Sequence, residues 1–274
     1  MTANFPATPL SHALAKSMPP HLRTPSRVRS LIALAGLVLA NSVSAQFTEV
    51  TSTVKPGSFL LEMDALSLVI DREAGDKSTA FAAGAFLVTT GLTKNWDLQL
   101  GAELFISQRI DLGGLKERNT GIGDIYVRTK WRFYEDERFE IALIPFAKIP
   151  SNTGGVGNDS VEGGLIVPWQ AYLFGAVTLN AMVEVDVVRN ARDDGYGLLW
   201  YGSAALSREL TKSLAVYAEI DAAKTSGTAP WQTTVGLGVY WSVTPFLAWD
   251  FAVYRGLSRV SPDWNPVVRV NVGF

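Results

Sequence analysis

"DIYVRTKWRF", residues 124–133, alternates between two kinds of side chain over its whole length. One set of positions is mostly apolar and carries Ile125, Val127, Thr129, Trp131 and Phe133. The other set is mostly charged and carries Asp124, Tyr126, Arg128, Lys130 and Arg132. Because successive side chains of a β-strand point to opposite faces, this period of two predicts a strand with one apolar and one polar face.

The same period recurs in "WDLQLGAELFI" (96–106), "LNAMVEVDV" (179–187), "LAVYAEIDA" (214–222) and "LAWDFAVY" (247–254). In 96–106 it assigns Phe105 to the polar face and Ile106 to the apolar face. We expect about twelve strands, near 58–70, 79–91, 96–108, 122–134, 139–149, 161–170, 176–189, 196–209, 213–223, 231–243, 246–256 and 264–274. Most exceed the usual strand length of about 5–6 residues. They match the roughly 9–11 residues that a tilted strand needs to cross a membrane.

The predicted connections alternate between short and long, apart from one poorly defined turn at 171–175. Short turns fall at 92–95, 135–138, 210–213 and 244–245, and long connections at 71–78, 109–121, 150–160, 190–195, 224–230 and 257–263. This order is typical of an all-β transmembrane antiparallel up-and-down β-barrel. A soluble β-sandwich also alternates, but it gives no reason for the aromatic residues beside the short turns, Trp96, Trp131, Phe133, Phe139, Trp241 and Phe246.

Residues 1–45 have the features of an export signal. They hold four basic and no acidic residues, followed by the apolar run "LIALAGLVLA" (31–40) and the small pair Ser44–Ala45. A basic start, a short apolar run and a small-residue cleavage site define a secretory signal peptide. We therefore expect cleavage after Ala45, export to the outer membrane of a bacterium, and a barrel domain spanning 46–274.

The segment "PVVRVNVGF" (266–274) keeps the alternation through Phe274. In a closed barrel the last strand pairs with the first, so the pattern can continue to its final residue. A terminal aromatic residue on the lipid side resembles the assembly signal of outer-membrane barrels. The expected partners are thus outer-membrane lipids and, through Phe274, the barrel assembly machinery.

The composition of residues 46–274 restricts the chemistry. This part has no cysteine, and both histidines, His12 and His21, precede it. A nucleophile paired with histidine and a zinc site of Cys and His are therefore excluded, and we expect neither an enzyme nor a metal or cofactor. Without the four leading bases, 20 Lys and Arg remain against 26 Asp and Glu, a net charge of −6 that argues against nucleic acid as a partner.

The polar faces of the strands would line the lumen of such a barrel. The candidate lining residues are Asp97, Glu103, Asp124, Arg128, Lys130, Arg132, Glu140, Glu219 and Asp250. Two roles stay open for them. They could pair across strands, the basic row on 124–133 with Asp97, Glu103 and Glu140, and merely fill the barrel. They could also line a passage for a small-molecule solute and set its selectivity.

Several stretches resemble the outer-membrane barrel family catalogued as "MetA-pathway of phenol degradation". They are "GIGDIYVRTKWRF" (121–133), "KIPSNTG" (148–154), "VYAEI" (216–220) and the region from Thr244 to Phe274 with Asp250, Gly256–Leu257 and Pro262–Asp263. The chain departs from the family at Ser151–Asn152, where Thr-Gly is usual. The resemblance implies a transporter for hydrophobic or aromatic compounds. The alternative is a non-conducting barrel that has a structural role or binds a ligand or partner.

Overall fold

The computed structural model describes residues 45–73, 76–112, 115–190, 195–227 and 230–274. The expected signal peptide lies outside these ranges except for Ala45, so its cleavage stays a prediction. In the described part of the chain, no helix is long and apolar enough to cross a membrane.

Thirteen strands form the described chain. Their bounds are β1 (Phe59–Glu73), β2 (Asp76–Thr93), β3 (Trp96–Leu112), β4 (Leu115–Gly121), β5 (Ile125–Glu135), β6 (Phe139–Ile149), β7 (Glu162–Tyr172), β8 (Val177–Arg189), β9 (Tyr196–Thr211), β10 (Leu214–Thr225), β11 (Gln232–Thr244), β12 (Leu247–Gly256) and β13 (Trp264–Gly273).

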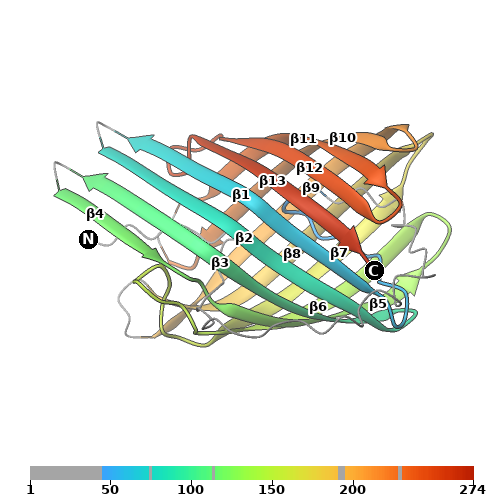
Figure 1. Cartoon of the computed structure of the whole chain (residues 1–274), viewed down its shortest axis with the longest axis horizontal. Coiled ribbons are helices and arrows are strands. Elements are labelled where there is room, and N and C mark those ends of the chain that lie inside the picture. Colours follow the sequence, from blue (N-terminus) through green and yellow to red (C-terminus); the bar gives the residue numbers. More distant parts are fainter. Residues whose placement is uncertain (1–44, 74–75, 113–114, 191–194, 228–229) are drawn as a thin grey trace, which may run out of the picture.

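Every pairing between these strands is antiparallel, and β1 pairs with β13 to close the sheet, with Leu61 opposite Val272. Strands β4 and β5 pair with successive stretches of β3, so they share one position in the wall. The result is a closed barrel of twelve strand positions, which confirms the predicted fold class. Figure 1 shows the tilted strands, with β1–β4 reaching beyond the others at one end.

This extension corrects two of the predicted long connections. Within 71–78, β1 continues to Glu73 and β2 begins at Asp76. Residues 109–121, expected as a long loop, instead continue β3 to Leu112 and form β4, and the strand expected from residue 122 begins at Ile125. Arg109, Lys116 and Arg118 are exposed on this hairpin. Because both of its faces meet a polar environment, nothing imposes the alternation by which the other strands are recognised.

A second correction concerns the inward and outward faces of β3. The pattern assigned Phe105 to the lumen and Ile106 to the lipid, but Phe105 is 39% exposed and Ile106 only 5%. The phase changes opposite Gly84, whose φ of 72° is a conformation that glycine adopts without strain. The side chain of Leu104 lies 2.8 Å from where a Cβ on Gly84 would be. The absence of a side chain at position 84 is therefore also required for the change of phase.

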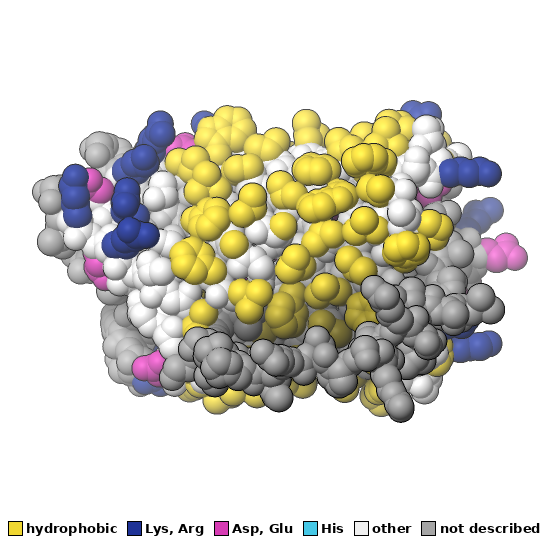
Figure 2. All heavy atoms as spheres, viewed as in Figure 1, with side chains coloured by type: hydrophobic (Ala, Val, Ile, Leu, Met, Phe, Trp, Pro, Cys, Tyr) yellow, Lys and Arg dark blue, Asp and Glu magenta, His cyan; other side chains and the backbone are white. Residues whose placement is uncertain are grey.

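The outer surface carries an apolar belt. Figure 2 shows hydrophobic side chains across the middle of the barrel and lysine and arginine toward both ends. Three of the aromatic residues beside the short turns contact one another, with ring centroids of Trp131 6.4 Å from Trp96 and 5.7 Å from Phe133. Apolar and aromatic residues at the hydrocarbon and its interface are what a membrane-spanning barrel requires.

The short β5–β6 turn is organised by Asp136. Its carboxylate accepts hydrogen bonds from the Tyr134 hydroxyl at 2.6 Å and from the amides of Arg138 and Phe139 at 2.8 Å. The Tyr134 hydrogen bond, followed by those two amides, lowers the pKa of Asp136 below its ordinary value. Since the folded pKa is depressed, this contribution to stability is present at neutral pH and is lost as the pH falls through it.

Membrane depth gives the first prediction. Leu100 and Leu92 are similarly exposed, at 50% and 55%, but Leu100 lies within β3 and Leu92 beside a short turn. Leu100→Arg should destabilise the barrel by about 2–4 kcal/mol and Leu92→Arg by about 0–1 kcal/mol, because the cost of a charge falls toward the interface. Urea unfolding in lipid vesicles measures both, and equal losses would contradict the proposed membrane position.

The barrel closes at its last residue. Phe59 and Phe274 exchange backbone hydrogen bonds of 2.7 and 2.9 Å, and their rings stack with centroids 5.6 Å apart. Phe274 is 57% exposed on the outside. The final aromatic residue therefore pairs the two ends of the sheet, while its recognition by the assembly machinery stays a prediction.

Deleting Phe274 should lower the amount of folded, heat-modifiable barrel in outer-membrane fractions, because both closing hydrogen bonds and the ring stack are lost. Phe274→Tyr keeps these contacts and is the matched control. Unchanged levels of the deletion variant would refute a role for Phe274 in assembly.

Candidate functional site: the lumen and its strap

Residues 45–57, here called the strap, lie inside the barrel. The strap joins β1 at the end with the short turns, where Pro56 bridges to Gly91 and the Gly57 amide donates to the Gly91 carbonyl at 3.1 Å. A Cβ on Gly91 would lie 2.2 Å from the Val54 carbonyl oxygen, so only glycine permits this approach. From there the strap runs back toward the middle of the lumen.

The strap is held by side chains from several strands. The Val54 amide donates to Asp97 on β3, and the Thr51 hydroxyl to Glu140 on β6 at 2.7 Å. Further inside, the Gln46 carbonyl accepts from Arg269 on β13 at 3.0 Å. These contacts come from widely separated parts of the wall, so the strap crosses the lumen.

Glu49 on the strap is the main partner of the basic row on β5. Its carboxylate lies 2.6 Å from Arg128 and 3.9 Å from Lys130, and Lys130 also donates to the Val50 carbonyl at 2.8 Å. The salt bridges of Arg128 and Lys130 thus go to a strap carboxylate, although Lys130 also lies opposite Asp97 in the register of β3 and β5. The expected pairing with a wall carboxylate holds for Arg132, which lies 3.3 Å from Glu140.

Two of the family-like motifs meet at Asp124. The carboxylate of Asp124 lies 3.2 Å from Lys148 and accepts from the amides of Ser151 and Asn152 at 2.9 and 3.0 Å. A Cβ on Gly121 would lie 1.9 Å from the Thr153 carbonyl oxygen, which explains the glycine. Asn152, where the chain departs from the family, adds a side-chain hydrogen bond to Asp124 at 2.8 Å. The motifs "GIGD" and "KIPSNTG" thus form one structural unit.

The opposite wall is built from tyrosines that lie over glycines of β11. Gly236 stands between Glu219 on β10 and Tyr254 on β12, and the Tyr254 hydroxyl donates to Glu219 across it. Gly238 stands beside Tyr217 in the same way, and the Tyr217 hydroxyl donates to Asp250 at 2.9 Å. A Cβ would lie 2.3 Å from the Tyr254 ring at Gly236, so the missing side chain makes room for the ring.

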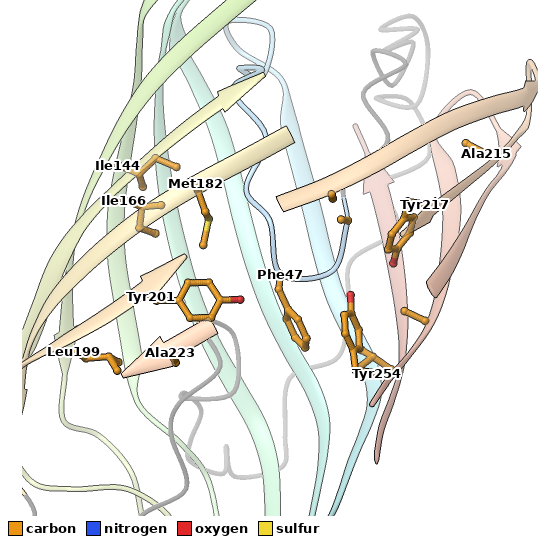
Figure 3. Close-up of a cluster of buried hydrophobic side chains, with 14 residues drawn as sticks. Phe47, Ile144, Ile166, Met182, Leu199, Tyr201, Ala215, Tyr217, Ala223 and Tyr254 are labelled. Atoms are coloured by element: carbon orange, nitrogen blue, oxygen red, sulfur yellow. The ribbon is translucent and has the colours of Figure 1, made fainter. Parts of the chain in front are cut away.

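A hydrophobic cluster lies against these tyrosines. It includes Phe47 from the strap together with Ile144, Ile166, Met182 and Tyr201 from the wall. Figure 3 shows Phe47 within the cluster, with Tyr201 and Tyr254 on opposite sides of it. The Phe47 and Tyr254 ring centroids are 4.2 Å apart, so the strap inserts an aromatic ring into the wall.

Charge is distributed unevenly over the interior. Among the described residues, ten carboxylates are buried: Asp64, Asp97, Glu103, Asp124, Glu140, Glu184, Asp186, Glu219, Asp221 and Asp250. The buried bases of the same ranges are Arg128, Lys130, Lys148 and Arg269. The buried charges on strands β8, β10 and β12 are all acids, and the four buried bases lie on β5, β6 and β13. Within the described chain no group of three or more side chains is arranged to hold a metal ion.

A small cavity of about 20 Å³, enough for about one water molecule, lies beside the strap. It is lined by Ala45–Glu49 and by Glu62, Asp64, Ala85, Leu87 and Arg269 of β1, β2 and β13. The strap therefore leaves only a water-sized space on this side of the lumen.

The candidate lining residues predicted from the sequence occupy distinct places. Eight are buried and Arg132 is partly buried. Five of them bond directly to the strap: Asp97, Arg128, Lys130, Glu140 and Glu219. Asp124 bonds to the amide of Ser151 in a loop, and Asp250 bonds to Tyr217. Glu103 is buried on β3. Their part in solute selectivity stays a prediction.

The strap, with Phe47 and Glu49, was not predicted from the sequence. Residues 46–57 have no alternation, so no strand was expected there. The available signal was an acidic and an aromatic residue close together just before the first strand of the barrel.

The sequence pattern described as "Putative MetA-pathway of phenol degradation" matches residues 43–271. The chain belongs to this family. Among curated proteins no sequence matches. The family match covers the strap as well as the barrel, so both parts are included in the pattern that defines it.

Solved structures share the fold of this family member. The COG4313 outer membrane channel from Pseudomonas putida F1 has 11% identity and a TM-score of 0.67 over 82% of this chain and 98% of that one. The NanC porin has 10% identity and a TM-score of 0.51 over 78% and 98%. The β domain of the Bordetella autotransporter BrkA has 11% identity and a TM-score of 0.50 over 81% and 100%. At such identities the likeness concerns the fold, and function rests on the lumen.

Glu49→Gln should loosen the strap. Removing one partner of a buried ion pair costs about 3–5 kcal/mol while the other charges stay buried, and withdrawal of the strap lets water reach Arg128 and Lys130 instead. In a Ser52→Cys background, maleimide labelling of the strap should become severalfold faster. Glu135→Gln, which removes an exposed partner of Arg132 at 3.1 Å, is the control. Equal labelling rates in both variants would contradict this role of Glu49.

Gly236→Ala should destabilise the barrel by about 1–3 kcal/mol, because its Cβ displaces the Tyr254 ring. Gly202→Ala is the matched control, since the nearest atom to its Cβ, the Met182 carbonyl oxygen, is at an ordinary 3.5 Å. Unfolding midpoints in vesicles distinguish the two, and identical midpoints would show that the tyrosine does not need the glycine.

Proposed function

We propose that this protein is a passive outer-membrane channel for small solutes, with a preference for cations and for compounds that carry an aromatic ring. The excess of buried carboxylates over buried bases is the observation that carries the proposal. A closed barrel that served only as a scaffold could fill its interior with apolar side chains, whereas acids that outnumber the bases need water or mobile cations to balance their charge.

The walls of the proposed passage differ in charge. Glu184, Asp186, Asp221 and Asp250 lie on the acidic side, away from the bases of β5 and β6. A row of one sign raises the local concentration of counter-ions, which is how charged constrictions select ions. The cavity beside the strap has room for little more than water, so a solute can follow this route only when the strap moves.

The aromatic part of the proposal rests on two observations. The family is described by a pathway of phenol degradation, and the lumen contains an aromatic and aliphatic cluster around Phe47. An apolar lining with a few placed polar groups is the usual character of a site for small organic molecules.

The alternative is a non-conducting barrel with a structural or ligand-binding role, in which the strap is a permanent plug. The strap favours it, since ion pairs and hydrogen bonds attach the strap to opposite sides of the lumen. The two functions differ in whether ions cross the barrel.

Planar-bilayer recording of the refolded barrel tests the channel. We expect currents in the wild type, a severalfold larger conductance after deletion of residues 46–55, and a reversal potential under a KCl gradient that indicates cation preference. Asp221→Asn combined with Glu184→Gln should reduce this preference, because the acidic wall loses two charges. The absence of current in both the wild type and the strap deletion would overturn the channel and leave the non-conducting barrel.

A further inference from the structure

Phe47 is the only aromatic residue of the strap, and it is deeply enclosed. It is 8% exposed, and its ring packs on Tyr254 within the cluster drawn in Figure 3. The other members of the cluster belong to the barrel wall, apart from Ala45 of the strap. The wall therefore forms an aromatic pocket whose occupant is supplied by a separate segment of the chain.

The same segment satisfies the carboxylate at the edge of this pocket. Glu219 accepts from the Phe47 amide at 3.2 Å, the Thr48 amide at 2.5 Å and the Thr48 hydroxyl at 2.5 Å. Glu219 also accepts from the hydroxyl of the wall residue Tyr254. If the strap withdraws, Glu219 loses three donors at once and keeps the Tyr254 hydroxyl, and a buried carboxylate in that state requires a new donor or a cation.

The geometry of the occupant defines a chemical class. Phe47 presents a nitrogen donor to Glu219 and a phenyl ring to Tyr254, with two carbon atoms, Cα and Cβ, between them. A free molecule with this outline is an arylethylamine, which carries a positive charge at neutral pH. An ammonium group is a stronger hydrogen-bond donor to a carboxylate than the neutral Phe47 amide is, because hydrogen bonds between ions are stronger than those between neutral groups.

The surroundings favour a cation over an anion. Asp221 lies two residues from Glu219 on β10, and Asp250 is held by Tyr217 on the adjoining wall. Arg269, a base that contacts the strap at Gln46, is already bonded to Asp64 at 2.6 Å and to the Gln46 carbonyl. The rings of Tyr201 and Tyr254 also provide faces that attract ammonium groups.

We propose that Glu219, Tyr254, Tyr201 and the adjoining hydrophobic cluster form a binding site for monocyclic aromatic amines, a site that Phe47 and Thr48 of the strap occupy in the resting barrel. The solute and the strap compete for it, so binding of the amine releases the strap. This inference rests on the proposed function, which it deepens by naming a solute class and a means of opening.

The first test is calorimetric titration of detergent-solubilised barrel with 2-phenylethylamine. Phe47→Ala vacates the aromatic part of the pocket and should bind roughly tenfold more tightly than the wild type or better, because the amine then displaces only the backbone and Thr48 contacts to Glu219 and no longer the Phe47 ring. Adding Glu219→Gln to Phe47→Ala should weaken binding roughly tenfold, since the ion-pair hydrogen bond is lost. Glu135→Gln in the same background removes an exposed charge and is the control.

3-Phenylpropionate has a similar size but the opposite charge, and it should not bind to Phe47→Ala. The proposal is overturned if Phe47→Ala shows no saturable binding of the amine. It is also overturned if the amine and the acid bind equally and Glu219→Gln has no effect, in which case the pocket is only an apolar anchor for the strap.

A second measurement needs no change in the pocket. In the Ser52→Cys barrel, 2-phenylethylamine should raise the rate of maleimide labelling of the strap severalfold, and 3-phenylpropionate should leave it unchanged. A labelling rate that does not respond to the amine overturns the competition. Bilayer currents from the same preparations distinguish this proposal from the channel. Current without binding of 2-phenylethylamine refutes this site alone. Binding of 2-phenylethylamine without current refutes the channel alone.

Discussion

The structure depends on one constraint, which is that every backbone amide and carbonyl within the hydrocarbon must find a partner in the wall. Closure between β1 and β13 satisfies it, and the hydrogen bonds between Phe59 and Phe274 complete the seam. Once the wall is closed, its outer face is surrounded by lipid and its inner face lines the lumen. The outer face must be apolar, and the inner face can hold the charges that the alternation places there.

The charges inside the barrel then need partners of their own. Arg128 and Lys130 find theirs on Glu49 of the strap, and Arg269 finds one on Asp64 and another on a strap carbonyl. The strap is consequently bound by the same groups that would otherwise require water. A segment held by ion pairs and hydrogen bonds can exchange them for hydration, whereas a segment packed by apolar burial alone has no such substitute. This makes the strap suited to be a movable part of the lumen.

The wall opposite the basic row is specialised in another way. Glycines on β11 allow Tyr217 and Tyr254 to lie across the strand and reach carboxylates on its neighbours. Aromatic faces, carboxylates and a nearby aliphatic cluster thereby occur together. The same barrel fold occurs in a channel, a porin and an autotransporter domain, so the fold leaves the function open and these interior side chains carry it.

The sequence by itself determined the closed barrel, the number of strand positions and the facing of residues such as Leu100 and Arg128. It could do so because the period of two is a local property, imposed on each strand by lipid on one side and the lumen on the other. It did not determine the β3–β4 extension, where both faces are polar, or the change of phase opposite Gly84. Only the tertiary structure decided that Glu49 pairs with the basic row and that Phe47 occupies the pocket beside Glu219. These contacts join residues up to 172 positions apart, through a strap without a repeating pattern, so they exist only once the barrel has closed around it.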